Sequence, residues 1–143
     1  MKRLIATTLL AAATSLAFAQ ASPVGLWKTI DDETKAEKSF VRISDAGGVL
    51  TGKVEKIIDP AKQNEVCDDC KDERKGQRIL GMTIIRGAKA DAKAEHWEGG
   101  EILDPANGKV YKLRLKPLDG GKKLEVRGYL GPFYRNQQWI KAD

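Results

Sequence analysis

Cys67 and Cys70 carry the most reactive chemistry in this sequence. They enclose Asp68 and Asp69 and are the two cysteines of the 143-residue chain. Three interpretations are open: a disulfide, half of a zinc site, or a redox-active pair. A redox thiol needs a lowered pKa, which two adjacent carboxylates oppose. A zinc site needs three or four protein ligands, and the chain has one histidine. An oxidising compartment favours the disulfide.

His96 and the acidic residues are the remaining candidates for acid–base chemistry. His96 adjoins Trp97, with Glu95 and Glu98 nearby. Neighbouring residues of a strand point to opposite faces, which favours a surface histidine over one in a pocket. The sequence has no nucleophile-elbow, zinc-protease, phosphate-loop or dinucleotide motif. We therefore expect no catalytic residue, no metal and no cofactor, and an enzyme built on paired carboxylates is the minor alternative.

The charge balance argues against a nucleic-acid surface. The chain holds 25 Lys and Arg against 20 Asp and Glu, for a net charge of +5. These charges are interspersed along strand-like segments, whereas a nucleic-acid surface requires basic clusters with aromatic residues between them. We expect a solvated surface with at most a weak attraction to anionic envelope components.

The amino terminus predicts export. Residues 1–3 are basic at two positions, residues 4–18 are mostly apolar, and Ala17-Phe18-Ala19 matches a small-x-small cleavage site. A transmembrane anchor needs about twenty apolar residues, and this run has roughly fifteen. We expect a signal peptide at 1–19, one mature domain at 20–143 without a transmembrane segment, and a periplasmic or secreted location. The oligomeric state is left open.

Eight strand-like runs follow this leader. In the clearest hairpin, from 97 to 115, Asp104-Pro105-Ala106-Asn107-Gly108 has the chemistry of a turn, and apolar and polar residues alternate after it. The alternation breaks at Gly99-Gly100, which predicts a bulge. The expected strands are 26–30, 39–43, 50–58, 79–86, 95–103, 109–116, 124–130 and 133–140. Because closure removes exposed edges, we predict an all-β, eight-stranded antiparallel up-and-down barrel.

Alternate positions of these strands define the expected inward face. An eight-stranded barrel is either filled by such side chains or holds one small ligand. We predict that a small, mainly apolar molecule, such as a lipid or fatty-acyl chain, binds inside and contacts Tyr111. The predicted ligand-binding residues are Met82, Ile84, Tyr111, Leu113 and Val126.

Three segments resemble one known family. They are Gly25-Leu26-Trp27, W-E-G-G-E-I-L-D-P-A-N-G-K-V-Y-K-L and V-R-G-Y-L-G-P-F-Y-R-N-Q-Q-W. Together they resemble the domain of unknown function 2147 family of small exported bacterial proteins. The resemblance implies a lipocalin-like barrel and, by analogy with lipocalins, a small apolar ligand in its mouth. The family has no established activity.

The same resemblance implies a structural role for Trp27 and Arg135. Lipocalins place an arginine over the tryptophan of the Gly-x-Trp motif, and Arg135 is the most similar position here, with Arg127 as the alternative. Guanidinium stacking on an indole contributes about 0.5–2 kcal/mol. We expect the main role of this pair to be holding the fold together, ahead of any role in ligand binding.

Three functions are therefore to be distinguished. An apolar cavity of several hundred Å³ would support ligand binding. A filled barrel with an exposed apolar patch would support an envelope interaction module. Carboxylates converging at the barrel mouth, with a pKa perturbed by burial, would be needed for an enzyme.

Overall fold

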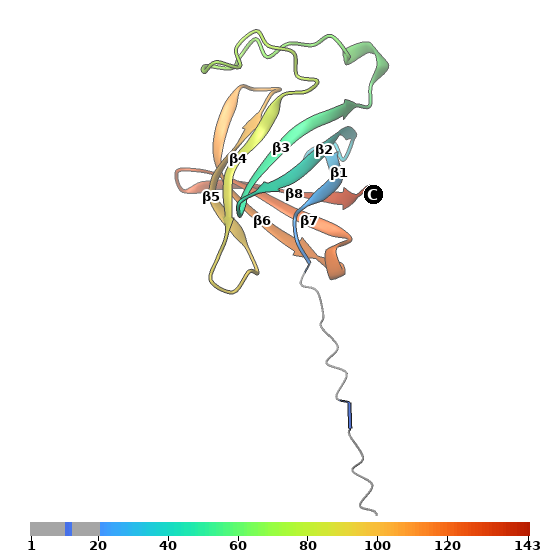
Figure 1. The fold of residues 1–143 in the computed structure, drawn as a ribbon. Helices are drawn as coiled ribbons and strands as arrows, with labels where there is room; N and C mark the ends of the chain where they lie inside the picture. Colours follow the sequence, from blue (N-terminus) through green and yellow to red (C-terminus); the bar gives the residue numbers. More distant parts are fainter. Residues whose placement is uncertain (1–10, 13–20) are drawn as a thin grey trace, which may run out of the picture.

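The structure is a closed antiparallel barrel of eight strands. It is a computed structural model that describes residues 11–12 and 21–143, so the predicted signal peptide at 1–19 lies outside the described residues except for 11–12. Each strand pairs with its neighbours in sequence, and the first closes on the last (Figure 1). The strands are β1 (Gly25–Ile30), β2 (Glu37–Ala46), β3 (Val49–Ile57), β4 (Thr83–Ala90), β5 (Trp97–Asp104), β6 (Lys109–Leu118), β7 (Lys123–Leu130) and β8 (Phe133–Lys141). The predicted up-and-down barrel is confirmed.

Helical structure in the described residues is confined to two short 3-10 turns. These are η1 (Pro60–Lys62) and η2 (Asp119–Gly121). In that part of the chain, no helix has the length and apolar character needed to span a membrane.

The strand β4 differs most from its prediction. It begins at Thr83 and not at residue 79, because the backbone turns just before it: Met82 N donates to the Ile79 carbonyl at 3.0 Å, and Gly81 has a φ of 87°. A positive φ is strained for most residues but is open to glycine. The strand then continues to Ala90, beyond its predicted end at residue 86.

The predicted bulge is confirmed in β5. The register between β5 and β6 shifts between Glu98 and Gly100. A Cβ at Gly100 would collide with the Arg86 carbonyl of β4. The bulge therefore lets two neighbouring strands of the wall approach closely where the barrel bends.

Trp27 is fully buried at the start of β1, at the end of the barrel opposite its mouth. Its indole Nε1 donates to the Pro23 carbonyl at 2.7 Å, and Lys141 Nζ lies 4.9 Å from its ring centroid. The predicted stacking of Arg135 on this ring is wrong. Lys141 is the Cα partner of Trp27, and Arg135 lies six positions earlier on β8, about 20 Å along an extended strand.

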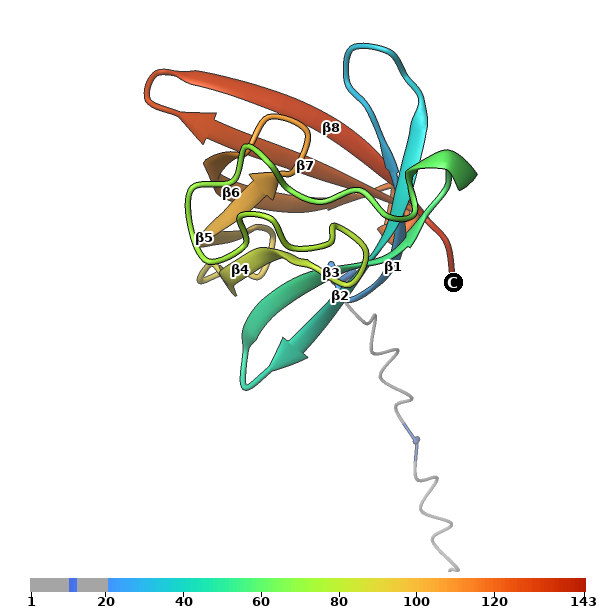
Figure 2. The same cartoon turned by 90° about the horizontal axis from the view of Figure 1, so that it is seen from above.

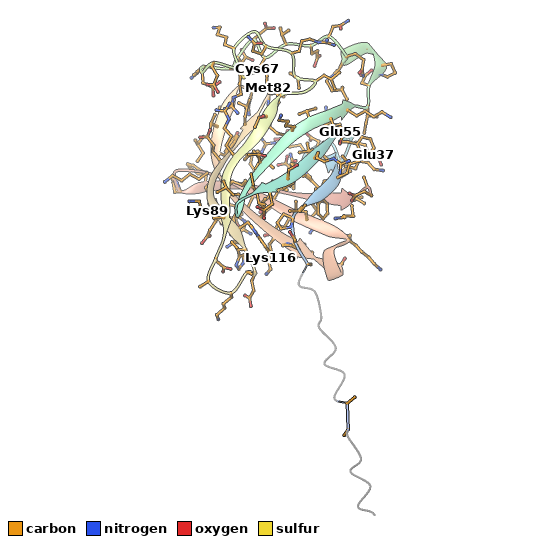
Figure 3. The ribbon with its side chains drawn as sticks, viewed as in Figure 1. Glu37, Glu55, Cys67, Met82, Lys89 and Lys116 are labelled. Carbon is orange, nitrogen blue, oxygen red and sulfur yellow. A yellow bond between two sulfur atoms is a disulfide. The ribbon has the colours of Figure 1, made fainter. Side chains whose placement is uncertain are left out.

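The connection at 58–82, between β3 and β4, runs across the open end of the barrel (Figure 2). Cys67 and Cys70 form a disulfide in it, with an S–S distance of 2.00 Å, which confirms the disulfide interpretation. The buried Arg74 donates to Asp72 and, through Nη1 at 3.0 Å, to the Thr83 carbonyl. Figure 3 shows Cys67 at this end of the molecule. These contacts hold the connection against the barrel.

Substitution of Gly108 tests how closely this connection packs against the β5–β6 turn. Gly108 has a φ of 72°, and a Cβ there would collide with the Asp69 carbonyl beside the disulfide; Gly48 has a φ of 88° and open space around it. Alanine strains either backbone by about 1–2 kcal/mol. We expect Gly108→Ala to reduce the free energy of unfolding by at least about 1 kcal/mol more than Gly48→Ala, because it also displaces the connection. Urea titration measures both, and equal losses would contradict this close packing.

Candidate ligand-binding cavity

The barrel encloses a cavity of about 450 Å³ that opens beside the 58–82 connection. Its walls come from inward positions of the strands and from the loops at one end of the barrel. The larger aliphatic and aromatic side chains of the lining are Val54, Ile57, Ile79, Ile84, Ile102, Tyr111, Val126 and Trp139. The ionisable side chains of the lining are Asp31, Lys38, Lys62, Glu65, Asp104, Tyr111 and Arg135. The cavity thus has an apolar wall and charged groups of both signs.

Three of the five predicted ligand-binding residues line this cavity: Ile84, Tyr111 and Val126. Met82 and Leu113 are buried in the core but are not among the lining residues. Met82 belongs to the turn before β4 and not to a strand, while Leu113 lies two residues deeper in β6 than Tyr111. Alternation identified the inward face but not the depth of each residue along the barrel axis.

Arg135 lies at the centre of a polar cluster inside the barrel, which we call the Arg135 cluster. Its Nη2 and Nε donate to the two carboxylate oxygens of Asp32 at 2.7 and 3.2 Å, and its Nη1 donates to Asp104 Oδ2 at 3.1 Å. Gln137 Nε2 donates to Asp32 Oδ1 at 3.0 Å, and Trp139 Nε1 donates to Gln137 Oε1 at 2.9 Å. The cluster thus connects β8 to the loop after β1 and to the last residue of β5.

Local structure places each carboxylate. Asp31 Oδ1 accepts from the backbone N–H of Thr34 at 2.8 Å, which lowers the pKa of Asp31 and shapes the loop that presents Asp32. Asp104 begins the β5–β6 turn, where its Oδ1 accepts from Ala106 N at 2.9 Å while its Oδ2 stays available to Arg135. Such aspartate turns are local structures that sequence chemistry favours.

The ion pairs in this cluster fix the charge state of Asp32. Hydrogen bonding from Arg135 lowers the pKa of Asp32 to about 2, against the opposing effect of burial. The same contact with Asp32, followed by a contact with Tyr111, raises the pKa of Arg135. Asp32 therefore stays ionised at neutral pH and offers no proton. This arrangement is suited to orient a polar group.

Tyr111 occupies the position where the apolar wall meets the Arg135 cluster. The Arg135 Cζ lies 6.0 Å from its ring centroid, and its hydroxyl accepts from Asn107 Nδ2 at 3.2 Å. A Cβ at Gly128 would lie 2.9 Å from the Tyr111 Cβ. Glycine at this position of β7 therefore makes room for the tyrosine ring within the barrel.

Sequence reasoning missed several residues of the site. The sequence patterns give Asp32, Gln137 and Trp139 no role and place Asp104 only in a turn. The alternation of the last strand could have identified all three inward side chains of β8 as cavity residues. No local signal pairs Asp32 with Arg135, which are 103 residues apart.

The closed eight-stranded barrel with an interior cavity is a lipocalin-like fold. Protein HP1028 from the human pathogen Helicobacter pylori, reported to belong to the lipocalin family, has a similar structure with a TM-score of 0.72. The similarity covers 86% of this chain and 84% of that one at 16% sequence identity, so it shows the fold alone.

The family model of DUF2147, described as an uncharacterized protein conserved in bacteria, matches residues 25–141. The chain belongs to this family, which confirms the resemblance noted in the sequence. No curated protein matches the chain.

Two arginines provide a matched test of the Arg135 cluster. Arg135→Met leaves Asp32 and Asp104 facing each other without a cation, whereas Arg127 lies outside the barrel, 4.5 Å from the Tyr134 ring. We expect Arg135→Met to lower the free energy of unfolding by about 1–2 kcal/mol, since the pair is partly screened by solvent. Arg127→Met should cost less. Urea titrations at neutral pH that give equal midpoints would refute this role.

Acid titration tests the same cluster through Asp32. Its pKa of about 2 in the folded protein lies below the ordinary value of 3.8. The ionised form therefore stabilises the fold above about pH 4, and this contribution is lost as the pH falls toward 2. We expect Asp32→Asn to be less stable than wild type at pH 7 and to lose less stability between pH 5 and 2. Asp68→Asn, in the exposed disulfide loop, should follow wild type in thermal melts across this range.

Proposed function

We propose that this protein is an exported binding protein that holds one small, mainly apolar molecule in its barrel cavity. The observation that carries the proposal is the cavity of about 450 Å³ with an apolar wall and a polar cluster. Ligand sites are of this kind: concave, of a few hundred Å³, mostly apolar and with a few placed polar groups. Slim guests such as a fatty-acyl or isoprenoid chain suit the bore of an eight-stranded barrel.

The charges of the lining favour a ligand with an uncharged polar end. Lys38, Lys62 and Arg135 are balanced by Asp31, Glu65 and Asp104, so neither sign of charge dominates. Arg135 is already shared by two carboxylates, and a further carboxylate beside it would meet Asp32 and Asp104. A hydroxyl, ester or amide end meets no such repulsion. We place this end near the Arg135 cluster and the apolar body along Ile84, Tyr111 and Val126.

The predicted signal peptide and the disulfide support a location outside the cytoplasm. Disulfides persist in oxidising compartments such as the periplasm or the extracellular space. A binding role is proposed in preference to an enzymatic one because hydrogen bonding from Arg135 keeps Asp32 ionised, whereas a general acid needs a raised pKa.

Two valines of the barrel wall allow a matched test. Val126 lines the cavity, and Val110 is exposed on the neighbouring strand β6. We expect Val126→Phe to fill the cavity and weaken binding of the uncharged probe N-phenyl-1-naphthylamine by more than about tenfold, the scale of steric changes in an apolar pocket. Val110→Phe should bind as wild type does. Fluorescence titration measures both affinities, and urea titration checks that both variants fold.

Native mass spectrometry of protein purified from its own cells identifies the guest. The expected result is a bound mass of a few hundred daltons that is lost from Val126→Phe. A wild-type protein that arrives empty and binds no probe, or equal probe affinities of wild type and Val126→Phe, would overturn the proposed function.

A further inference from the structure

The tip of the β7–β8 hairpin is the most exposed apolar feature among the described residues. Phe133 is 76% exposed, Tyr134 57% and Leu130 46%. The turn between the strands consists of Gly131 and Pro132, which adds no charge. Both views show this hairpin projecting beyond the neighbouring wall of the barrel (Figures 1 and 2). Large apolar side chains gathered on a projecting tip indicate a surface that contacts something other than water.

Both faces of this tip are apolar. Leu130 pairs with Phe133 on the face that continues the cavity wall, and Tyr129 pairs with Tyr134 on the outer face, with ring centroids 6.1 Å apart. A flat protein partner would cover one face and leave the other in water. An occupant that covers both must surround the tip, as the interfacial region of a lipid bilayer does.

The size and charge of the tip also favour a bilayer. The tip offers a handful of side chains, while a stable protein interface uses about 20–30 residues on each side. Between Val126 and Ile140 the sequence has two arginines and no acidic residue. Arg135 is paired inside the barrel, while Arg127 on the outside lies 4.5 Å from the Tyr134 ring and 3.8 Å from the Glu125 carboxylate. Tyrosine and arginine beside an apolar tip are typical of the headgroup level of a membrane.

We propose that the β7–β8 hairpin docks the barrel onto the surface of a lipid bilayer with anionic headgroups. Leu130 and Phe133 enter the boundary of the acyl chains, while Tyr129, Tyr134 and Arg127 lie among the headgroups. Gly128 and Arg135, two residues from the tip on each strand, line the cavity. Docking therefore brings the mouth of the barrel to the membrane surface, and it does not require the cavity to be occupied.

Sedimentation with vesicles tests this docking. The vesicles contain phosphatidylethanolamine and phosphatidylglycerol at 3:1, and phosphatidylcholine vesicles serve as the uncharged comparison. We expect the mature wild-type protein to bind the anionic vesicles more strongly. The double variant Leu130→Ser/Phe133→Ser should bind them more than about tenfold less, because it removes two insertable apolar side chains. The control Ile140→Ser, which changes an exposed apolar residue at the far end of β8, should bind as wild type does.

Three results would overturn the proposal. They are a wild-type protein that stays in the supernatant with both vesicle types, equal binding of wild type and the double variant, and a wild-type dimer in analytical ultracentrifugation that the double variant loses without any vesicle binding. Val126→Phe separates this proposal from ligand binding: a filled cavity should leave vesicle binding unchanged. Urea titration verifies that each variant is folded, so that weak binding is not due to unfolding.

Discussion

The closure of the barrel depends on a short seam between β1 and β8. These strands share two Cα pairs, Trp27 with Lys141 and Lys28 with Ile140, whereas β7 and β8 pair over eight positions. Backbone hydrogen bonding therefore joins one end of the seam and leaves the rest of β8 without β1 beside it. Side chains complete the closure: Lys141 covers Trp27 at the closed end, and Asp32 binds Arg135 and Gln137 near the mouth. Along the part of β8 that does not pair with β1, side-chain contacts thus take the place of the missing backbone hydrogen bonds.

This use of side chains couples the stability of the barrel to its interior. Arg135 lies in the cavity lining and, together with Gln137, joins the loop after β1 to β8. Losing any one partner of a partly buried arginine between two carboxylates destabilises the fold, because the remaining charges stay desolvated without full compensation. The polar side chains of the cavity wall are thus needed for a second purpose, which is to close the seam between β1 and β8. A ligand that displaced Arg135 from Asp32 would loosen the barrel, so a neutral guest beside the cluster is compatible with both demands.

The sequence predicted the local features of the fold and missed the long-range ones. The Asp104–Gly108 turn, the bulge at Gly100 and the inward positions of Ile84, Tyr111 and Val126 follow from turn chemistry and from the two-residue period of a strand. The partner of Arg135 does not follow from these rules. Alternation tells which face a residue occupies, but its height in the barrel depends on the register across the seam, and no local pattern encodes the pairing of Trp27 with Lys141.

The unequal lengths of the strand pairs account for both the Arg135 cluster and the apolar tip. Because β1 stops pairing with β8 at Lys28, the half of β8 that begins at Phe133 is supported by β7 alone. Near the barrel, this half of β8 carries Arg135 and Gln137, and both side chains donate hydrogen bonds to Asp32 in the loop after β1. Beyond the barrel, the inner face of the hairpin presents the exposed side chains of Phe133 and Leu130 to the surroundings. Within two residues at the rim of the cavity, β8 therefore changes from Arg135, which closes the barrel through polar contacts, to Phe133, which is apolar and exposed. A barrel that docks on a membrane by its mouth needs such an apolar segment beside a polar rim.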